Sequence, residues 1–410
     1  MDYSKFYTDR ARRMKASEIR EILAVTQRSE IISFAGGLPN PATFPVREIE
    51  EATNEVLAKH AALALQYSPT DGIPELREQV SAMLNRDGTR YTPDNILITN
   101  GSQQGLDLLG RVFLEPGSKV LVGSPTYLGA IQSFENYLHR ESDFVPVRSD
   151  DEGMDPESID ETVTRLKRVG QKVKIVYTCP TFANPSGTVL SLSRRRRLVE
   201  LAHEHDILII EDDPYGKLRF EGEELPSMAS MDKEGRVIYL GTFSKILVPG
   251  FRLAWTAGDP KLIRQLSIGK QAMDLCTNAF TQFITANLMQ QGLIQRHLPT
   301  IISLYRKKRD LMLQAMKARL PTGTRWTNAQ GGLFTWATLP RGIDTTKMFQ
   351  RAIKNKVAYV PGNSFFVDLS GPNTMRINFS HAADEMIPVG VDRLAHTIEE
   401  EMRATHKVVA

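Results

Sequence analysis

Residues 237–252 read VIYLGTFSKILVPGFR. The segment opens with an apolar run of strand length and continues into a turn that contains two hydroxyl residues, Thr242 and Ser244. Lys245 follows at once, beside the apolar residues 246–248, and Arg252 comes a few positions later. Most lysines are solvated surface residues, but a lysine held in apolar surroundings loses its proton more readily and can act as an amine nucleophile. The segment therefore predicts a strand whose end carries a reactive amine.

Apolar runs of strand length recur from residue 96 up to and into this segment, each followed by a turn and a helical pattern. They are Ile96–Thr99, Lys119–Val122, Val173–Tyr177, Ile207–Ile210 and Val237–Leu240. Short apolar strands that alternate with helices predict a parallel sheet covered on both faces. The stretch Phe251–Ala257 closely follows the last of these strands and could pair antiparallel.

The C-terminal part of the chain predicts a second, smaller unit. Apolar positions follow a helical period from about Ile301 to Leu320, and a closing helix carries Ile387 to Met402 on one face. Between these helices lie three strand candidates, Gly332–Thr338, Val357–Val360 and Thr374–Phe379. We therefore expect an α/β fold with a large sheet domain and a smaller C-terminal α/β domain.

The composition excludes several classes of protein. Of 410 residues, 41% are hydrophobic and 24% charged, and the formal net charge of +3 gives no support to a nucleic-acid partner. The polar start lacks the apolar core of a signal peptide, and no apolar run approaches the ~20 residues that cross a bilayer. Two cysteines, Cys179 and Cys276, cannot build a disulfide framework. We expect a soluble, cytoplasmic protein without a nucleic-acid or membrane partner.

The run Arg194–Arg197 could suggest nuclear targeting or nucleic-acid binding. It lies between Ser193, a suitable N-cap, and the apolar-rich residues 198–202. We interpret the run as the solvated first turn of a helix, where each positive charge opposes the helix dipole by about a few tenths of a kcal/mol.

The residues that follow each predicted strand are the candidates for function, because ligands of open parallel sheets bind at the carboxyl ends of the strands. After the first strand, Gly101 permits a tight turn and Ser102 can cap the next helix, whose exposed N–H groups then suit a phosphate. Many helices begin this way with nothing bound. The Asn184-Pro185 pair, beyond the 173–177 strand, is likewise typical of a simple turn.

Charged residues at two other strands are more informative. Glu211, Asp212 and Asp213 follow the 207–210 strand, either as solvated acids or as metal ligands. Metal binding is disfavoured because no histidine cluster accompanies them. Arg376 interrupts the largely apolar 374–379 strand. It is either an outward-facing arginine or a buried guanidinium, which requires an anion.

Seven such motifs occur in order along the chain. They are Tyr67, Ser102-Gln103, Tyr127, Asn184-Pro185-Ser186-Gly187, Asp212 with Tyr215, Ser244-Lys245 with Arg252, and Arg376. The series resembles the class I/II aminotransferases of pyridoxal 5'-phosphate (PLP) fold type I, from about Ile19 to the last helix. Residues 16–21, 33–39, 66–70 and 101–104 are most similar to the 2-aminoadipate, kynurenine and archaeal-type aromatic aminotransferases.

The resemblance implies the domain organisation and the assembly. A large PLP-binding domain, residues 47–295, is expected to contain a mostly parallel seven-stranded sheet. Residues 1–46 and 296–410 are expected to form the small α/β domain. The expected assembly is a homodimer with shared active sites, in which Tyr67 reaches the phosphate site of the neighbouring subunit.

The resemblance also implies how the cofactor is held. Lys245 would carry PLP as a Schiff base and, once displaced by the substrate amine, move the proton between Cα and C4′. Asp212 would face the pyridine nitrogen, where a charge pair at ~4 Å and an effective dielectric constant of ~20 contributes roughly 4 kcal/mol. Tyr215 and Asn184 would bond the phenolic oxygen, and Tyr127 would stack on the ring. The phosphate would meet the N–H groups of Ser102 and Gln103, the hydroxyls of Thr242 and Ser244, and Arg252.

Four residues are expected at the substrate. Arg376 would bind the α-carboxylate beside Asn184, and Gly37 belongs to a loop, residues 36–38, that would close over the substrate. Arg20, in a helical pattern at residues 17–24, would meet the distal carboxylate of an acidic substrate. The alternative for Arg20 is a solvated helix face.

Two other functions remain open. A ligand-sensing regulator with an aminotransferase-like domain would carry a winged helix ahead of it, and the resemblance begins too near the start to leave room for one. A different PLP reaction, such as β-elimination or decarboxylation, would use the same residues but would not need a 2-oxo acid. For amino-group transfer, the donor could be aromatic, kynurenine, 2-aminoadipate or glutamate, and 2-oxoglutarate is the expected acceptor.

Overall fold

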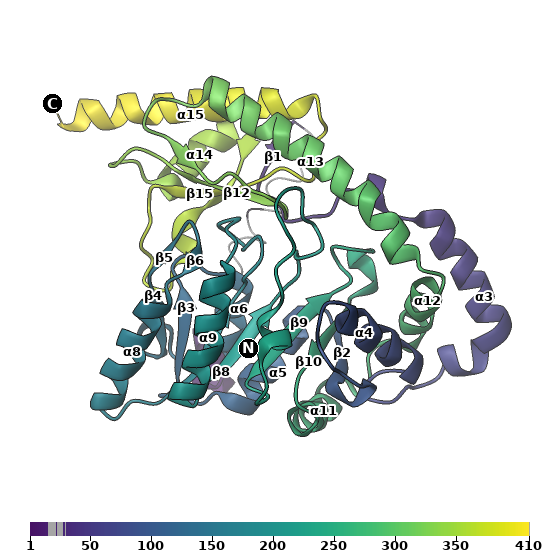
Figure 1. Cartoon of the computed structure of the whole chain (residues 1–410). Helices are drawn as coiled ribbons and strands as arrows, with labels where there is room; N and C mark the ends of the chain where they lie inside the picture. Colours follow the sequence, from purple (N-terminus) through teal and green to yellow (C-terminus); the bar gives the residue numbers. More distant parts are fainter. Residues whose placement is uncertain (15–21, 23–27, 29, 410) are drawn as a thin grey trace.

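The six strands predicted for the large domain and one further strand form a central seven-stranded sheet (Figure 1) in the computed structural model, which describes residues 1–14, 22, 28 and 30–409. The strand order is β2-β10-β9-β8-β7-β3-β4. β10 runs antiparallel to its neighbours β2 and β9, and the other pairs are parallel. The expected α/β class, the mostly parallel sheet and the antiparallel strand are confirmed. In chain order the strands are β2 (Ile96–Asn100), β3 (Lys119–Gly123), β4 (Phe144–Val147), β7 (Val173–Thr178), β8 (Leu208–Asp212), β9 (Val237–Thr242) and β10 (Leu253–Ala257).

The edge strand β4 is one that the sequence pattern did not identify. It is short and contains Pro146, which cannot donate a hydrogen bond to a sheet ladder. Proline is tolerated in such a strand because β4 stands at the end of the sheet and pairs with β3 alone.

Helices cover both faces of the sheet because successive strand residues point to opposite sides. In β9, Val237 and Tyr239 join one core, whereas Ile238 and Leu240 join the other. Because helices cover both faces, polar side chains gather at the edge of the sheet that is formed by the ends of the strands. The first core contains residues of α3 (Val46–Ala64), α4 (Pro74–Arg86), α8 (Pro156–Arg168), α9 (Leu192–His205), α10 (Met228–Met231) and α12 (Ala279–Gln290), and the second those of α5 (Ser102–Phe113), α6 (Leu128–Phe134) and α11 (Pro260–Asp274).

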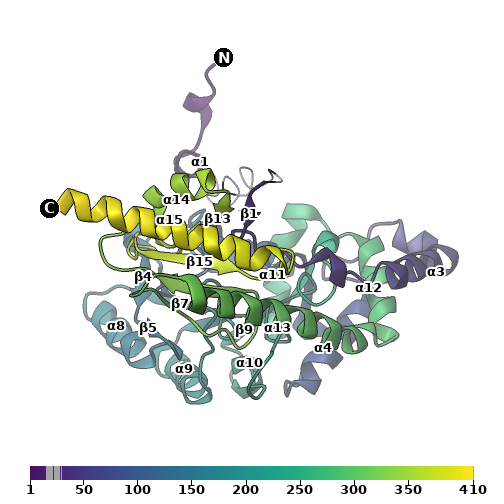
Figure 2. The ribbon, with the colours of Figure 1, turned by 90° about the horizontal axis from the view of Figure 1, so that it is seen from above.

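The C-terminal part forms a second sheet with the order β11-β12-β15-β14. Its helices are α13, α14 and α15, and Figure 2 shows α13 and α15 lying side by side. The bounds are β11 (Arg325–Trp326), β12 (Phe334–Thr338), β14 (Val360–Pro361), β15 (Thr374–Asn378), α13 (Leu293–Arg319), α14 (Thr345–Lys354) and α15 (Met386–Val409).

The predicted 357–360 strand is divided in the structure. Its first half, β13 (Val357–Ala358), pairs in parallel with β1 (Ile32–Ser33), and its second half is β14 of the C-terminal sheet. The split attaches the N-terminal part of the described chain to the C-terminal unit.

We retain the expected domain boundaries, 47–295 against 1–46 with 296–410, as a proposal. The pairing of β1 with β13 supports it. Helix α13 also begins in one core and ends in the other: Leu293 and Ile294 join the large-sheet core, whereas Ile301 and Tyr305 join the C-terminal one.

Short elements complete the described chain. They are η1 (Ser4–Phe6), α1 (Asp9–Arg13), η2 (Pro41–Thr43), η3 (Pro93–Asn95), α7 (Arg140–Asp143), β5 (Ser149–Asp150), β6 (Gly153–Met154), η4 (Pro249–Phe251) and η5 (Gly362–Phe365).

None of the helices within the described ranges is long and apolar enough to cross a membrane.

The interpretation of Arg194–Arg197 as a solvated first turn is wrong. The N-cap of α9 is Ser191, not Ser193, so the run lies inside the helix. Arg195 is only 2% exposed. Its guanidinium donates to the carbonyls of Pro180, Leu190 and Pro226 and to the hydroxyl of Thr181. A buried guanidinium with several acceptors fixes the chain between β7 and α9, which includes Asn184.

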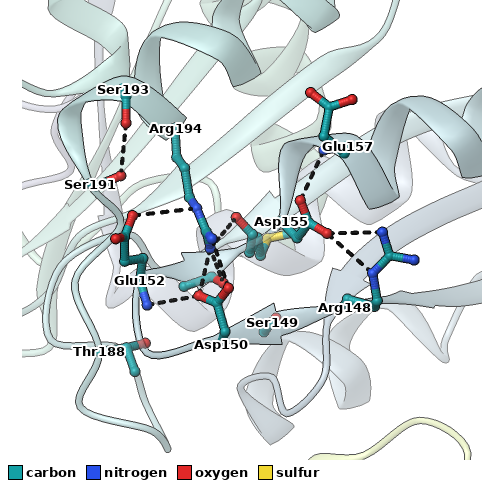
Figure 3. A network of polar contacts seen from close by, with 12 residues as sticks. Arg148, Ser149, Asp150, Glu152, Asp155, Glu157, Thr188, Ser191, Ser193 and Arg194 are labelled. Carbon is teal, nitrogen blue, oxygen red and sulfur yellow. Dashed lines mark hydrogen bonds and ion pairs between the residues drawn. The ribbon is translucent and has the colours of Figure 1, made fainter.

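Arg194 is also held by protein groups. Figure 3 shows it reaching from α9 to Asp150, with both carboxylate oxygens of Asp150 at 2.7 Å from its terminal nitrogens. Glu152 lies beside the same guanidinium, at 3.7 Å. Arg197 pairs with Glu204 at 2.8 Å along its own helix. These acids offset the positive charges of Arg194 and Arg197.

Candidate active site

A cavity of about 330 Å³ opens where the carboxyl ends of the large-sheet strands meet the C-terminal unit. Most of the residues expected to touch cofactor or substrate line this site cavity. They are Gly37, Ser102, Gln103, Tyr127, Asn184, Asp212, Tyr215, Thr242, Ser244, Lys245, Arg252 and Arg376.

Two predicted residues are not part of the cavity in the described chain. Tyr67 is 77% exposed and does not line it. Arg20 lies outside the described residues, and so do Ser17, its expected N-cap, and most of the expected helix at residues 17–24.

One end of the cavity is formed by the start of α5 and by Arg252. Gly101 is the N-cap of this helix, with a φ of 74°, and Ser102 is the first helical residue, so the expectation of a Ser102 cap is wrong. A Cβ atom on Gly101 would lie 2.2 Å from a terminal nitrogen of Arg252. Glycine is therefore required for the guanidinium to lie against the helix start. A helix N-terminus with no side-chain cap and an adjacent cation form an anion site.

The side chains nearby define this end further. The Thr242 hydroxyl accepts a hydrogen bond from the Ser244 N–H at 3.0 Å, which fixes the turn ahead of Lys245. The Gln103 side chain is directed away, toward α6, and donates to the carbonyl of Gly129 and the hydroxyl of Ser133.

Asp212 ends β8 and is 3% exposed. One carboxylate oxygen, Oδ2, accepts a hydrogen bond from the hydroxyl of Tyr177 at 2.7 Å, and the other, Oδ1, has no hydrogen-bond partner in the described chain. Burial raises the pKa of Asp212 to about 7, although the Tyr177 hydrogen bond acts to lower it. A buried carboxylate oxygen without a donor, beside a cavity, matches a ligand that carries a positively charged N–H group.

The side chain of Lys245 is partly buried, and its Nζ donates to the carbonyl of Gly37 at 2.9 Å. Burial, together with the positive charges of Arg376 and Arg252, lowers the pKa of Lys245 to about 8. The amine is therefore substantially neutral, and nucleophilic, at a pH where exposed lysines are charged.

Arg376 lies in the middle of β15 and is 2% exposed. Its guanidinium carbon lies 4.3 Å from the ring centre of Phe334. Two of its nitrogens donate to the side-chain oxygen of Asn184 and to the carbonyl of Ala35, and Nε has no partner in the described residues. Burial lowers its pKa to about 10. The alternative of an outward-facing arginine is excluded. Because both of its hydrogen-bond acceptors are uncharged, the guanidinium can still bind an anion.

The three consecutive acids have separate functions in the structure. Glu211 accepts the N–H groups of Met228 and Ala229 at the start of α10, and Asp213 accepts the hydroxyl of Tyr239. No group of three potential metal-ligating side chains occurs in the parts of the chain that are described.

Several residues that line the cavity were not expected from the sequence. Tyr177 was predicted as the last residue of the 173–177 strand and was passed over because only residues beyond each strand were considered; in the structure it lies one residue before the end of β7. Phe334 was assigned only to the C-terminal sheet. Extending the search for functional residues one position into each strand would have found Tyr177. The unexpected lining residues are Pro39, Tyr177, Cys179, Pro214, Pro249 and Phe334.

Comparison with known proteins identifies the family. The model of aminotransferase class I and II matches residues 29–394. The chain belongs to this family. It is 50% identical over 404 residues to aromatic-amino-acid aminotransferase 1 of Thermococcus litoralis, with 98% of this chain and 96% of the relative covered. It is 39% identical to the 2-aminoadipate transaminase of Thermus thermophilus, covering 97% and 98% of the two chains.

A solved structure confirms the fold type. Pyrococcus horikoshii kynurenine aminotransferase, crystallised with PMP, kynurenine and its product, superposes with a TM-score of 0.94. It is 48% identical, and 98% of each chain is covered. This aminotransferase is thus a PLP-dependent transaminase of fold type I, and its activity is amino-group transfer. The anion site, the unpartnered Asp212 oxygen and the amine of Lys245 fit PLP, which carries a phosphate, a ring nitrogen and an aldehyde.

The lowered pKa of Lys245 can be tested directly. In cofactor-free enzyme, the neutral amine is present above about pH 8 and is lost below it. The rate at which a small acylating reagent labels Lys245 should therefore reach half its maximum at about pH 8. Peptide mass spectrometry across a pH series measures this rate, with exposed lysines in the same digest as the reference. A half-maximum above about pH 10, as for an ordinary lysine, would contradict the assignment.

Proposed function

We propose that this transaminase uses Lys245 as cofactor anchor and proton carrier, and that it transfers the amino group of an aromatic, kynurenine, 2-aminoadipate or glutamate donor to 2-oxoglutarate. One observation supports this most: the Lys245 amine lines the same cavity as the unpartnered oxygen of Asp212 and the buried guanidinium of Arg376.

PLP supplies an electron sink for the substrate Cα when it is bound. Its phosphate would occupy the anion site. Asp212 would receive the ring N–H, Tyr127 would lie against the ring face, and Asn184 and Tyr215 would donate to the phenolic oxygen. Burial raises the pKa of Tyr215 well above its usual value, which keeps its hydroxyl protonated as a donor. The groups proposed for the phosphate are the N–H groups of Ser102 and Gln103, the hydroxyls of Thr242 and Ser244, and Arg252.

The catalytic contribution of Lys245 follows from its environment. A neutral Nζ can accept the proton that leaves the substrate Cα and hold it for return. Burial, together with the positive charges of Arg376 and Arg252, favours this neutral form. Arg376 would bind the substrate α-carboxylate in bidentate geometry, together with Asn184.

Replacing Lys245 with alanine should lower turnover at least about 100-fold, because general-base catalysis contributes roughly 10²–10⁴-fold. Initial rates with an amino donor and 2-oxoglutarate measure the loss, and Lys261→Ala, a change on the surface, is the control. Borohydride treatment of the wild-type enzyme should fix the cofactor to the peptide that contains Lys245. Attachment to another lysine, or turnover that needs no 2-oxo acid, would contradict the proposal.

The proposed assembly is a homodimer in which Tyr67 completes the partner's phosphate site. The motivation is the exposure of Tyr67, together with exposed Leu63 and Leu65 beside it. An apolar cluster of this kind on a surface is typical of an interface.

Mixing two inactive variants tests this arrangement. Tyr67→Phe subunits and Lys245→Ala subunits should each have low activity. Their heterodimer should recover activity, because one of its two sites lacks both changes. Rates after denaturation and refolding of the mixture, compared with each variant refolded alone, measure the recovery. A fully active monomer in sedimentation at the assay concentration would exclude the shared site.

The proposal for Arg20 concerns acidic substrates and rests on the resemblance alone. A charge-assisted hydrogen bond contributes about 1.5–3 kcal/mol, so Arg20→Ala should lower kcat/KM for 2-aminoadipate and glutamate by about 10- to 150-fold. Aromatic donors should be nearly unaffected. Half-reactions with each donor measure the difference, and Arg28→Ala is the matched control. An equal loss of kcat/KM for acidic and aromatic donors, or no loss for either, would contradict the proposal and support the alternative of a solvated helix face.

We also propose a cytoplasmic location. Both cysteines, Cys179 and Cys276, are free thiols, as is usual in a reducing compartment. Cell fractionation with detection of the native protein tests this location, and recovery in a secreted fraction would contradict it.

A further inference from the structure

Tyr177, one residue before the end of β7, and Asp212, the last residue of the neighbouring strand β8, lie on the same side of the large sheet. Tyr177 pairs in register with Ile210 of β8, and Asp212 lies two residues beyond Ile210, so its side chain points to the same face. The tyrosine is fully buried, and its ring packs edge-on against Phe134, with 6.1 Å between the ring centres. The packing aims the hydroxyl at Asp212 Oδ2, 2.7 Å away.

This hydrogen bond determines how the carboxylate is oriented. With Oδ2 held by Tyr177, the unpartnered Oδ1 is left for a ligand in the site cavity, which both residues line. A free carboxylate could rotate about its last bond and lose this orientation.

The same hydrogen bond also favours the ionised form of Asp212. Burial and the negative charge of Asp213 both raise the pKa of Asp212, and the Tyr177 hydroxyl acts in the opposite direction. No positive side chain in the described chain contributes to this balance. Burial raises the pKa of Tyr177 itself well above its usual value, so the hydroxyl remains a donor at any physiological pH.

We propose that Tyr177 is a positioning residue for the cofactor: it turns Asp212 toward the ring nitrogen and favours the anionic carboxylate, so that the ring is bound in its protonated form. The proposal rests on the proposed function of Asp212 and goes beyond it, because it makes the affinity for the ring depend on a side chain that need not touch the ring.

The protein contains a matched control for this interaction. Tyr239 donates to Oδ2 of Asp213 at 3.1 Å, in the neighbouring strand β9. Asp213 also accepts the N–H of Gly216 at 2.9 Å, and it does not line the site cavity. Tyr239→Phe therefore removes the same kind of hydrogen bond without changing the group that faces the cofactor.

The experiment uses the full-length enzyme, freed of cofactor and titrated with pyridoxine 5'-phosphate, which carries the ring nitrogen and phosphate but no aldehyde for Lys245. Tyr177→Phe should weaken its binding about 10-fold or more, because hydrogen bonds to charged groups are the stronger ones. The ¹⁵N resonance of the labelled ring should move toward the unprotonated position. Tyr239→Phe should keep both the affinity and the resonance of wild type.

Comparison in an Asp212→Asn background separates this proposal from the function that it rests on. With Asp212 replaced, Tyr177→Phe should have little further effect on affinity. Equal losses in both backgrounds, or a protonated ring and wild-type affinity in Tyr177→Phe, would overturn the positioning role. If Asp212→Asn alone leaves binding unchanged, the proposed function of Asp212 fails instead.

Two further measurements distinguish loss of the Tyr177 hydrogen bond from misfolding of the variant. Tyr177→Phe should bind inorganic phosphate as wild type does, because the anion site lies on other elements. Encoding 3-fluorotyrosine at position 177 keeps both the ring and the donor, so it should retain affinity and ring protonation. Loss of both with this residue, in a protein that still binds phosphate, would also overturn the proposal.

Discussion

Charged groups are buried around the cavity between the two sheets without neutralising one another, and the rest of the site depends on this constraint. In the described chain, Lys245, Asp212 and Arg376 have neutral hydrogen-bond partners: a carbonyl, a tyrosine hydroxyl, and an amide oxygen with a carbonyl. Removing a charge from water costs several kcal/mol unless a partner replaces the solvent. The cost is visible as pKa values of about 8 for Lys245 and about 7 for Asp212. Such a cavity favours ligands that bring both signs of charge.

The two sheets build this cavity together. Parallel strands β7, β8 and β9 end at one rim, so a tyrosine, an aspartate and the turn before Lys245 arrive side by side. Arg376 comes from the middle of β15, in the other sheet, and Gly37 follows β1, which pairs with β13. The site is therefore complete only where the C-terminal unit meets the large sheet. Arg195, a buried residue of α9, helps fix the segment between β7 and α9 that presents Asn184 to this junction.

The sequence predicted the regular features and missed those that depend on packing. Apolar runs marked the buried strands, and polar residues just beyond them marked most of the cavity lining. Pro146 concealed β4, because proline is permitted only at an edge that the sequence cannot locate. Arg195 resembled a surface residue, because its acceptors are backbone carbonyls from distant segments. Tyr177 resembled core, since its aromatic ring is core and only its hydroxyl reaches the site. The N-cap of α9 is Ser191 and not the predicted Ser193. The backbone is extended at Ser191 and helical from Leu192 onward, and the sequence alone does not show where that change occurs.

The link between the two units uses the same side chains that we propose for the substrate. Arg376 joins them through the Asn184 side chain, a neutral acceptor of the large-sheet unit, and it also donates to the carbonyl of Ala35, which belongs to the same unit as Arg376. A carboxylate can bind a guanidinium in bidentate geometry, through two parallel charge-assisted hydrogen bonds. An amino acid at Arg376 would therefore strengthen the junction rather than compete with it, provided that Nε, which has no partner here, takes part. Closure around the substrate would then be driven by its α-carboxylate, the group common to every donor and acceptor, and the distal side chain would be left to determine specificity.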